Sequence, residues 1–226
     1  MNKHYEIIDK TKFKKISQYN WFRTFPDPTY GFNVKINVTK LIEFNKKHHY
    51  SFFITFIYLV TISMNEVYEM HLREIDNEKT IAYFPKINPT YTVLSNKNGV
   101  FYNARTDLTA SFKEFYTNCR NTIDYFKNKE DIVLDYNSDD LAVYYISCIT
   151  SLSMESMKHP TPAYNYVSNS VPRVFWDKYY YNELDNNYYV TLNITVSHTL
   201  VDGFPLTDAF NNLIKNINNL EEILNN

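Results

Sequence analysis

Residues 188–198 have the sequence YYVTLNITVSH, in which apolar and polar side chains alternate strictly. The apolar positions fall on one face of an extended chain: Val190, Leu192, Ile194 and Val196. This period of two is typical of a β-strand with one buried face. His198 follows with the parity of the apolar face, and Asp202 lies four residues further on. An imidazole at the edge of an apolar layer is suited to act as a general base.

The segments on both sides of this strand predict helices and strands in irregular alternation. Downstream, residues at helical spacing predict one apolar stripe on a C-terminal helix: Leu206, Ala209, Phe210, Leu213, Ile214 and Ile217. Upstream, strands are expected over residues 32–38, 80–84, 90–94, 144–153 and 171–179, with a turn at 96–99 and a return strand from residue 100. Helices are expected after the caps Thr39 and Ser51 and over residues 108–127.

This mixture of elements predicts a two-layer α/β sandwich, in which helices cover a mixed or mainly antiparallel sheet. The chain has 226 residues, of which 44% are hydrophobic, so it can bury a substantial core. The composition is even from end to end, without a repeat or a Gly/Ser-rich linker. We therefore expect a single domain over residues 1–226.

The composition also excludes several classes of protein. The net charge is −2 and no Lys/Arg cluster is present, which disfavours nucleic-acid binding. Cys119 and Cys148 are too few for a disulfide framework or a structural zinc site. The longest apolar-rich run, residues 52–63, is too short to cross a bilayer, and residues 1–15 lack the apolar core of a signal peptide. We expect a cytoplasmic protein with no metal and no membrane or nucleic-acid partner.

A histidine at a strand end is, on its own, more often structural than catalytic. Here it begins the string HTLVDGF, residues 198–204. That string matches the HxxxDG signature of the chloramphenicol acetyltransferases. The signature is shared by the acyltransferase domain of 2-oxo acid dehydrogenase complexes and by peptide-synthetase condensation domains. Its place after an alternating strand and before an amphipathic helix makes the match more specific than the pattern alone.

Further segments resemble the chloramphenicol acetyltransferase family in the same order along the chain. They are WFRTF at 21–25, PTYGFNVKINVT at 28–39, FITFIYLVTISMNE at 53–66, NPTYTVL at 88–94 with a phenylalanine at 101, YYISCITS at 144–151 and VPRVFWDKY at 171–179. The resemblance therefore extends over nearly the whole chain.

The resemblance implies a fold, an activity and an assembly. The family has a two-layer α/β fold, forms trimers with active sites between subunits, and uses acetyl-CoA to acetylate the 3-hydroxyl of chloramphenicol. His198 would be the general base, and Ser147 would donate a hydrogen bond to the tetrahedral oxyanion. We therefore expect acetyl-CoA as co-substrate, chloramphenicol or a similar small alcohol as acceptor, a role in antibiotic resistance, and a homotrimer. With both substrates bound in one ternary complex, no acyl-enzyme is required.

The resemblance also implies which residues contact the two substrates. Phe25, Thr92 and Phe101 match the aromatic, threonine and phenylalanine positions of the acceptor pocket. Lys178 and Tyr179 match the lysine near the 3′-phosphate of CoA and the tyrosine against its adenine. By residue type alone, the aromatic side chains are equally suited to a core and Lys178 to a solvated surface.

Asp202 has two interpretations. It orients His198 directly, or it has a structural role with another partner, which we favour because a buried carboxylate needs one. In the family the matching carboxylate pairs with an arginine near the N-terminus, and that arginine is missing here. The alignment places Gln18 or a neighbour at its position. The cations nearby in the sequence are Lys14, Lys15 and Arg23.

Other functions remain open from the sequence. A hydrolase that uses Ser147 as nucleophile is disfavoured, because no GxSxG elbow surrounds the serine. An acyltransferase core of a 2-oxo acid dehydrogenase complex is also disfavoured, because such cores normally follow a lipoyl domain and a linker, and a condensation domain is much longer. The missing arginine and the altered residues on the CoA side leave two alternatives. One is a non-catalytic trimeric binding protein, and the other is an acyltransferase with a different acceptor.

Overall fold

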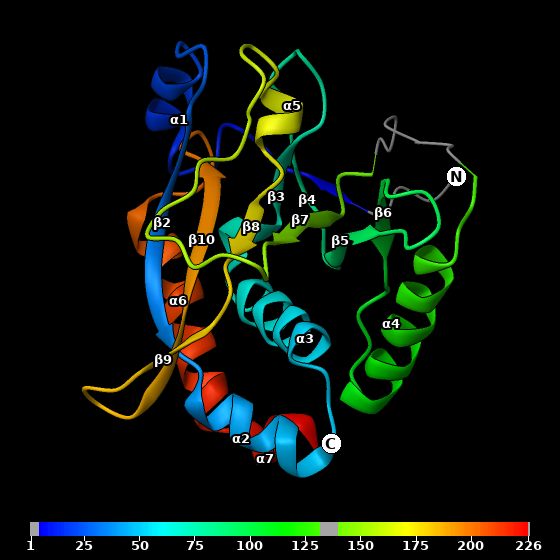
Figure 1. The fold of residues 1–226 in the computed structure, drawn as a ribbon. Helices are drawn as coiled ribbons and strands as arrows, with labels where there is room; N and C mark the ends of the chain where they lie inside the picture. Colours follow the sequence, from blue (N-terminus) through cyan, green and yellow to red (C-terminus); the bar gives the residue numbers. More distant parts are fainter. Residues whose placement is uncertain (1–4, 132–139, 226) are drawn as a thin grey trace.

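The computed structural model describes residues 5–131 and 140–225, and a seven-stranded sheet forms its centre (Figure 1). The strand order is β2-β10-β8-β7-β5-β6, and β9 pairs with β10. The strands are β2 (Thr29–Asn37), β5 (Asn88–Leu94), β6 (Phe101–Arg105), β7 (Val143–Cys148), β8 (Arg173–Trp176), β9 (Tyr180–Asn182) and β10 (Asn187–Ser197). A smaller sheet has the order β1-β4-β3, formed by β1 (Glu6–Ile7), β3 (Leu72–Glu74) and β4 (Ile81–Tyr83).

Seven α-helices and one 3-10 helix occur among these strands along the described parts of the chain. They are α1 (Ile16–Phe22), α2 (Thr39–His48), α3 (Phe52–Asn65), the 3-10 helix η1 (Tyr68–His71), α4 (Phe112–Lys127), α5 (Tyr166–Asn169), α6 (Gly203–Asn218) and α7 (Leu220–Leu224). Within the large sheet, β7 is parallel to β5 and β8, whereas the other pairs are antiparallel. The predicted class, a mixed α/β fold with a helix-covered sheet, is confirmed.

The two faces of the large sheet differ in what covers them. The side chains of Ile194, Val174 and Ile146 form one buried row across β10, β8 and β7. Phe56 of α3 contacts Trp176 on this face, so it is the helix-covered face. On the opposite face, the segment 149–165 crosses part of the sheet, and His159 packs its ring edge-on against Phe175. The alternation of the strands therefore divides the molecule into a helix layer and a more polar face.

Several predicted element boundaries differ from the structure. Thr39 is the first helical residue of α2 and not its cap, and its hydroxyl accepts a hydrogen bond from the Tyr188 N–H. Ser51 occupies the N-cap position of α3, but its side chain makes no capping bond. The strand expected to run to residue 153 ends at Cys148, and α4 begins at Phe112 instead of residue 108. In the C-terminal apolar stripe, Ile214 is exposed.

The long strand β10 connects two distant ends of the molecule. Its C-terminal end points toward α1, whereas α2 and α7 lie near its other end (Figure 1). The backbone confirms this placement, because the Val38 N–H at the start of α2 bonds to the Tyr188 carbonyl. His198 therefore belongs to the α1 end. Within the described residues, no helix has both the length and the apolar character needed to cross a bilayer.

Candidate active site

His198 lies directly after β10, between two aromatic rings. Its imidazole stacks on Phe22 at 3.8 Å and on Tyr30 at 4.4 Å between ring centroids. Its backbone N–H donates a hydrogen bond to the Pro28 carbonyl at 2.9 Å. Tyr30 is the register partner of Val196 on the neighbouring strand β2. The imidazole therefore lies on the apolar side of the sheet, as the alternation predicted.

Only one edge of this imidazole is open. The His198 side chain is 30% exposed. Its Nδ1 atom is buried, and it has no hydrogen-bond partner within the described part of the chain. Because Phe22 and Tyr30 cover the two ring faces, the exposed part is the edge that carries Nε2. A general base needs one nitrogen that a substrate can reach, and Nε2 meets that requirement.

Asp202 lies beside the buried edge of the ring. Its Oδ1 is 3.5 Å from His198 Nδ1, which is longer than an ordinary N–H···O hydrogen bond. Its Oδ2 is 2.9 Å from the Nζ of Lys15, and the same Nζ is 3.0 Å from Glu69. Burial lowers the pKa of Lys15, but the hydrogen bonds to Asp202 and Glu69 outweigh that effect and raise it. The cation that pairs with Asp202 is therefore Lys15, one of the three cations that the sequence offered in place of the missing arginine.

The two rings that enclose His198 are not among the site residues that the sequence predicts. Phe22 lies in the WFRTF motif and Tyr30 in the segment 28–39, but neither motif indicates a contact with the imidazole. One signal was available for Tyr30: pairing residues 29–37 antiparallel with 189–197 places it opposite Val196. No comparable signal existed for Phe22, because its position depends on where α1 lies over the end of the sheet.

Ser147 and Thr92 lie together on a different part of the sheet. Their hydroxyl oxygens, on β7 and β5, are 3.4 Å apart. Thr92 also lines a cavity of about 590 Å³, together with Phe101, Cys148, the first turn of α3 and residues of α4. This volume lies in the range of ordinary ligand pockets, about 300–1,000 Å³. Two of the predicted acceptor-pocket residues, Thr92 and Phe101, are thus beside the same cavity as the strand that carries Ser147.

The predicted CoA residues lie close to this cavity. Tyr179 is exposed, and its ring is 5.1 Å from that of Phe52 at the start of α3. Ser51 and Phe53, which flank Phe52, both line the cavity. Lys178 is exposed, and its backbone N–H donates to the Leu152 carbonyl. The CoA candidates and the serine strand thus approach one cavity from neighbouring elements.

Phe25 lies elsewhere, at the His198 end of the molecule. Its ring is 5.5 Å from that of Phe22, which in turn stacks on His198. The structure therefore divides the predicted site residues into two groups. Phe25 and Asp202 lie near His198, whereas Thr92, Phe101 and Tyr179 lie near the cavity.

Within one chain these two groups do not meet. The strand register places Ser147 beside Phe175, and Phe175 beside Asn193 of β10. His198 follows Asn193 by five residues, so it lies roughly 20 Å from Ser147, at about 3.3 Å per residue and 4.8 Å per strand. The two side chains also differ in parity, since Ser147 belongs to the face opposite the helices. A single chain cannot bring both residues to one substrate.

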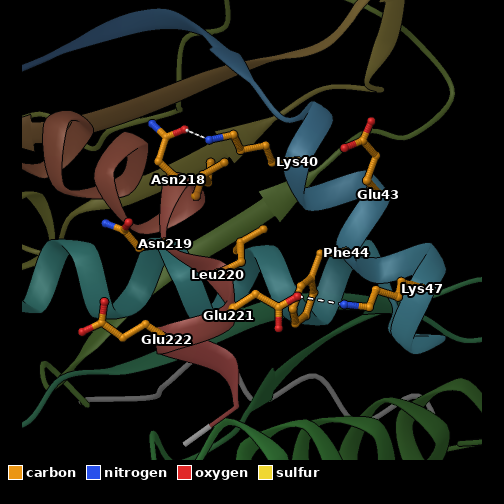
Figure 2. A pocket seen from close by; sticks show the side chains of 10 residues that line it. Lys40, Glu43, Phe44, Lys47, Asn218, Asn219, Leu220, Glu221 and Glu222 are labelled. Atoms are coloured by element: carbon orange, nitrogen blue, oxygen red, sulfur yellow. Dashed lines mark hydrogen bonds and ion pairs between the residues drawn. The ribbon is translucent and has the colours of Figure 1, made fainter.

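A separate groove lies at the α2 end of the molecule, opposite the end that carries His198 (Figure 1). It has a volume of about 560 Å³ and runs between α2 and the turn that joins α6 to α7 (Figure 2). Lys40 contacts Asn218 and Lys47 contacts Glu221 across it. None of the predicted site residues lines this groove. Within the described residues, no group of three or more His, Cys, Asp or Glu side chains is arranged to hold a metal ion.

Comparison with known proteins gives one family. A sequence model described as chloramphenicol acetyltransferase matches residues 1–214. Among curated relatives, the chloramphenicol acetyltransferase of Campylobacter coli is 29% identical over 202 residues, which cover 85% of this chain and 92% of the relative. That of Clostridium butyricum is 22% identical and covers 99% of each chain. That of one Staphylococcus aureus relative is 25% identical and covers 84% of this chain and 86% of its own.

Solved structures show the same fold. A chloramphenicol acetyltransferase superposes with a TM-score of 0.83 at 21% identity, covering 93% of this chain and 98% of the other. A probable dihydrolipoamide acetyltransferase from Listeria monocytogenes superposes with a TM-score of 0.65 at 15% identity, covering 94% and 93%. At these identities the likeness concerns the fold, and it agrees with the helix-covered mixed sheet described above.

Proposed function

The chain belongs to the chloramphenicol acetyltransferase family, an enzyme family, and we propose that it moves the acetyl group of acetyl-CoA to a hydroxyl of chloramphenicol or a similar small alcohol. The observation that carries the proposal is the environment of His198. Its ring is held on both faces, its Nδ1 is buried, and the Nε2 edge is open. Such a ring is pre-oriented to accept a proton from a bound alcohol. The names of the relatives support the choice of acceptor.

The proposed reaction is a direct transfer. His198 Nε2 accepts the proton of the acceptor hydroxyl while the hydroxyl oxygen attacks the acetyl carbonyl carbon. The resulting tetrahedral oxyanion accepts a hydrogen bond from the Ser147 hydroxyl, a contact worth roughly 3–4 kcal/mol in comparable sites. Collapse then breaks the C–S bond, and the imidazolium returns the proton to the departing CoA thiolate. The products are the O-acetylated alcohol and free CoA, and His198 is again neutral.

This mechanism requires two copies of the chain. Because His198 and Ser147 lie roughly 20 Å apart with opposite parity on the strands, one protomer supplies the base and another supplies the serine. A closed ring of identical subunits repeats such a head-to-tail contact at every interface. We therefore propose a homotrimer, in which each site combines the His198 group of one protomer with the cavity of its neighbour.

The cavity is the proposed place for acetyl-CoA and part of the acceptor. Thr92 and Phe101 would contact the acceptor, and Tyr179 and Lys178 would contact the adenine and phosphate of CoA. Phe25, which lies on the His198 side, would contact the acceptor from the other protomer. Asp202 would keep its structural role as the partner of Lys15 near the buried edge of the base.

The test is the release of free thiol from acetyl-CoA in the presence of chloramphenicol. Replacing His198 with alanine (H198A) is expected to lower kcat by roughly 10²–10⁴-fold, because general-base catalysis contributes that much. A matched control is H49N, since His49 is an exposed histidine with a left-handed backbone that asparagine tolerates.

The outcomes separate the proposal from its alternatives. Turnover with chloramphenicol that is lost in H198A and kept in H49N supports the proposal. If thiol is released only with other hydroxylated acceptors, acetyl transfer is supported and chloramphenicol is not the acceptor. Tight binding of chloramphenicol without any turnover would contradict the proposal and identify a binding protein.

A further inference from the structure

Glu74, the last residue of β3, is a buried carboxylate that the proposed reaction does not use. Its side chain has no exposure to solvent. Its Oε2 accepts hydrogen bonds from Arg23 Nε at 2.7 Å and from the Tyr19 hydroxyl at 3.1 Å. Its Oε1 accepts one from the Thr199 hydroxyl at 3.2 Å. Burial raises the pKa of Glu74 above its ordinary value, and the opposing effects of Arg23, Tyr19 and Thr199 offset that rise only in part. With donors on both oxygens, the group is arranged as an ionised acceptor.

One of these donors belongs to the end of β10. Thr199 directly follows His198, and its hydroxyl is also 2.8 Å from that of Ser197, which directly precedes it. A hydroxyl has one proton to donate, and the Thr199 proton is given to Glu74. Ser197 therefore donates to Thr199. The hydrogen bonds run from Ser197 to Thr199 to Glu74, and they fasten the residues on both sides of the base to β3.

The other two donors belong to α1 and its C-terminal cap. Tyr19 lies in α1 and is fully buried, and Arg23 caps the helix directly after Phe22. The Arg23 guanidinium also lies 3.6 Å from the centre of the Tyr166 ring, which fixes its other side. Phe22 in turn covers one face of the His198 ring. The same carboxylate thus holds the segment that carries the imidazole and the segment that stacks against it.

We infer that Glu74 is a positioning residue, which sets the orientation of the His198 imidazole by joining the end of β10 to α1 through Thr199 and Arg23. The inference rests on the proposed function for its kinetic consequence but not for its structural one. We name the set Glu74, Thr199, Arg23 and Tyr19 the Glu74 clamp. A base that is misplaced by a fraction of an ångström loses much of its rate, because general-base catalysis depends on alignment with the bound hydroxyl.

The clamp is tested by removing the hydrogen bond between Thr199 and Glu74. Thr199→Val removes the hydroxyl and keeps the side-chain shape, while the Arg23–Glu74 ion pair remains. Thr199→Ser keeps the hydroxyl and serves as the conservative rescue. We expect T199V to lower kcat for acetyl transfer by about tenfold to a hundredfold with the KM for acetyl-CoA nearly unchanged, and T199S to keep kcat within about twofold.

The matched control for buried-hydroxyl loss is Thr61→Val. Thr61 is fully buried in α3, and its hydroxyl donates only to the Ile57 carbonyl among the described residues. T61V loses stability for the same reason as T199V, a lost buried hydrogen bond, but it leaves the clamp intact. It is expected to keep the wild-type kcat. Glu74→Gln, which removes the charge, is expected to lower kcat as T199V does and to destabilise the fold further.

A second measurement does not depend on turnover. The side-chain NMR signals of the His198 ring are identified by their loss in H198A, and they are expected to shift in T199V but not in T61V or T199S. Shifted signals together with an inactive wild type would support the clamp and contradict the proposed function. Wild-type signals and wild-type kcat in T199V would overturn the clamp and leave the proposed function unaffected.

Discussion

The His198 imidazole is held mostly by residues that are distant in the sequence. Phe22 and Tyr30 cover its faces, and only Asp202 comes from the same motif. The Asp202–Lys15 pair removes one reason to suspect a non-catalytic protein, because the missing arginine has a replacement with the same sign of charge. Both side chains of the pair are about one-third exposed, so the pair contributes little to the free energy of unfolding. Its main effect is to fix the position of the Asp202 carboxylate.

A second histidine, His159, is buried and makes the stability of the protein depend on pH. His159 is 8% exposed, and burial, aided by the charge of Arg173, lowers its pKa from 6.5 to about 4. Between pH 6.5 and about pH 4, His159 therefore binds a proton in the unfolded chain but not in the folded chain. Stability therefore falls as the pH falls from 6.5 to 4, by about 3 kcal/mol from this group.

Urea unfolding at several pH values measures this effect. The variant His159→Gln keeps a polar side chain of similar size but does not titrate. The difference in unfolding free energy between pH 6.5 and pH 4 is expected to be smaller in H159Q by about 3 kcal/mol. Equal pH dependence in the two proteins would show that folding does not lower the pKa of His159.

The position of His198 could be predicted from the sequence, whereas the partner of Asp202 could not. The strand parity was enough to place His198 on the apolar face, and the HxxxDG resemblance was enough to single it out. The partner of Asp202 was not predictable, because Lys14, Lys15 and Arg23 are close in sequence and only the path of α1 separates them. Arg23 turns inward to Glu74, whereas Lys15 contacts Asp202.

At the scale of elements, the pairing of β2 with β10 depends on Gly31. A Cβ atom added at Gly31 would lie 2.5 Å from the Ile194 carbonyl oxygen and 3.0 Å from the Thr195 Cα. Both atoms belong to the backbone of β10, so they cannot move aside without disturbing the ladder. Gly31→Ala is expected to destabilise the protein by about 1–3 kcal/mol, as overpacking does.

Gly203 provides the control for this substitution. A Cβ added at Gly203 meets nothing within 4 Å, and the residue begins α6 with an ordinary backbone. G203A is expected to change the unfolding free energy by less than about 0.5 kcal/mol. Equal unfolding free energies for G31A and G203A would contradict the close contact between β2 and β10 at Gly31.

Element boundaries were predicted less well than element types, and tertiary contacts explain why. Thr39 was predicted to cap α2, but its N–H donates a hydrogen bond to the Asn37 side chain. Its hydroxyl accepts a hydrogen bond from the Tyr188 N–H of β10. The strand from Val143 was expected to continue past Cys148. Instead the Asp177 carboxylate accepts a hydrogen bond from Met154 N–H and holds the following segment as a loop. The Thr39–Tyr188 and Met154–Asp177 contacts join residues that are distant in the sequence, so no local pattern predicts them.

At the scale of the whole molecule, the fold explains why the proposed site would combine two copies of the chain. The long strand β10 carries His198 to one end of the sheet, whereas Ser147, Thr92 and the cavity lie further along and on other strands. The sequence pattern alone could not show this separation, because strand order and register are not visible in it. The family resemblance did imply it, through its active sites between subunits.

Complementation between two inactive variants, H198A and Ser147→Ala, tests directly whether one active site combines residues of two protomers. Each variant alone is expected to lose roughly 10²-fold or more in kcat. When the two chains are co-expressed and assemble at random, about a quarter of the interfaces combine an intact His198 with an intact Ser147. The mixed protein is therefore expected to regain about a quarter of wild-type thiol release. Activity no higher than the average of the two separate variants would contradict a site shared between protomers.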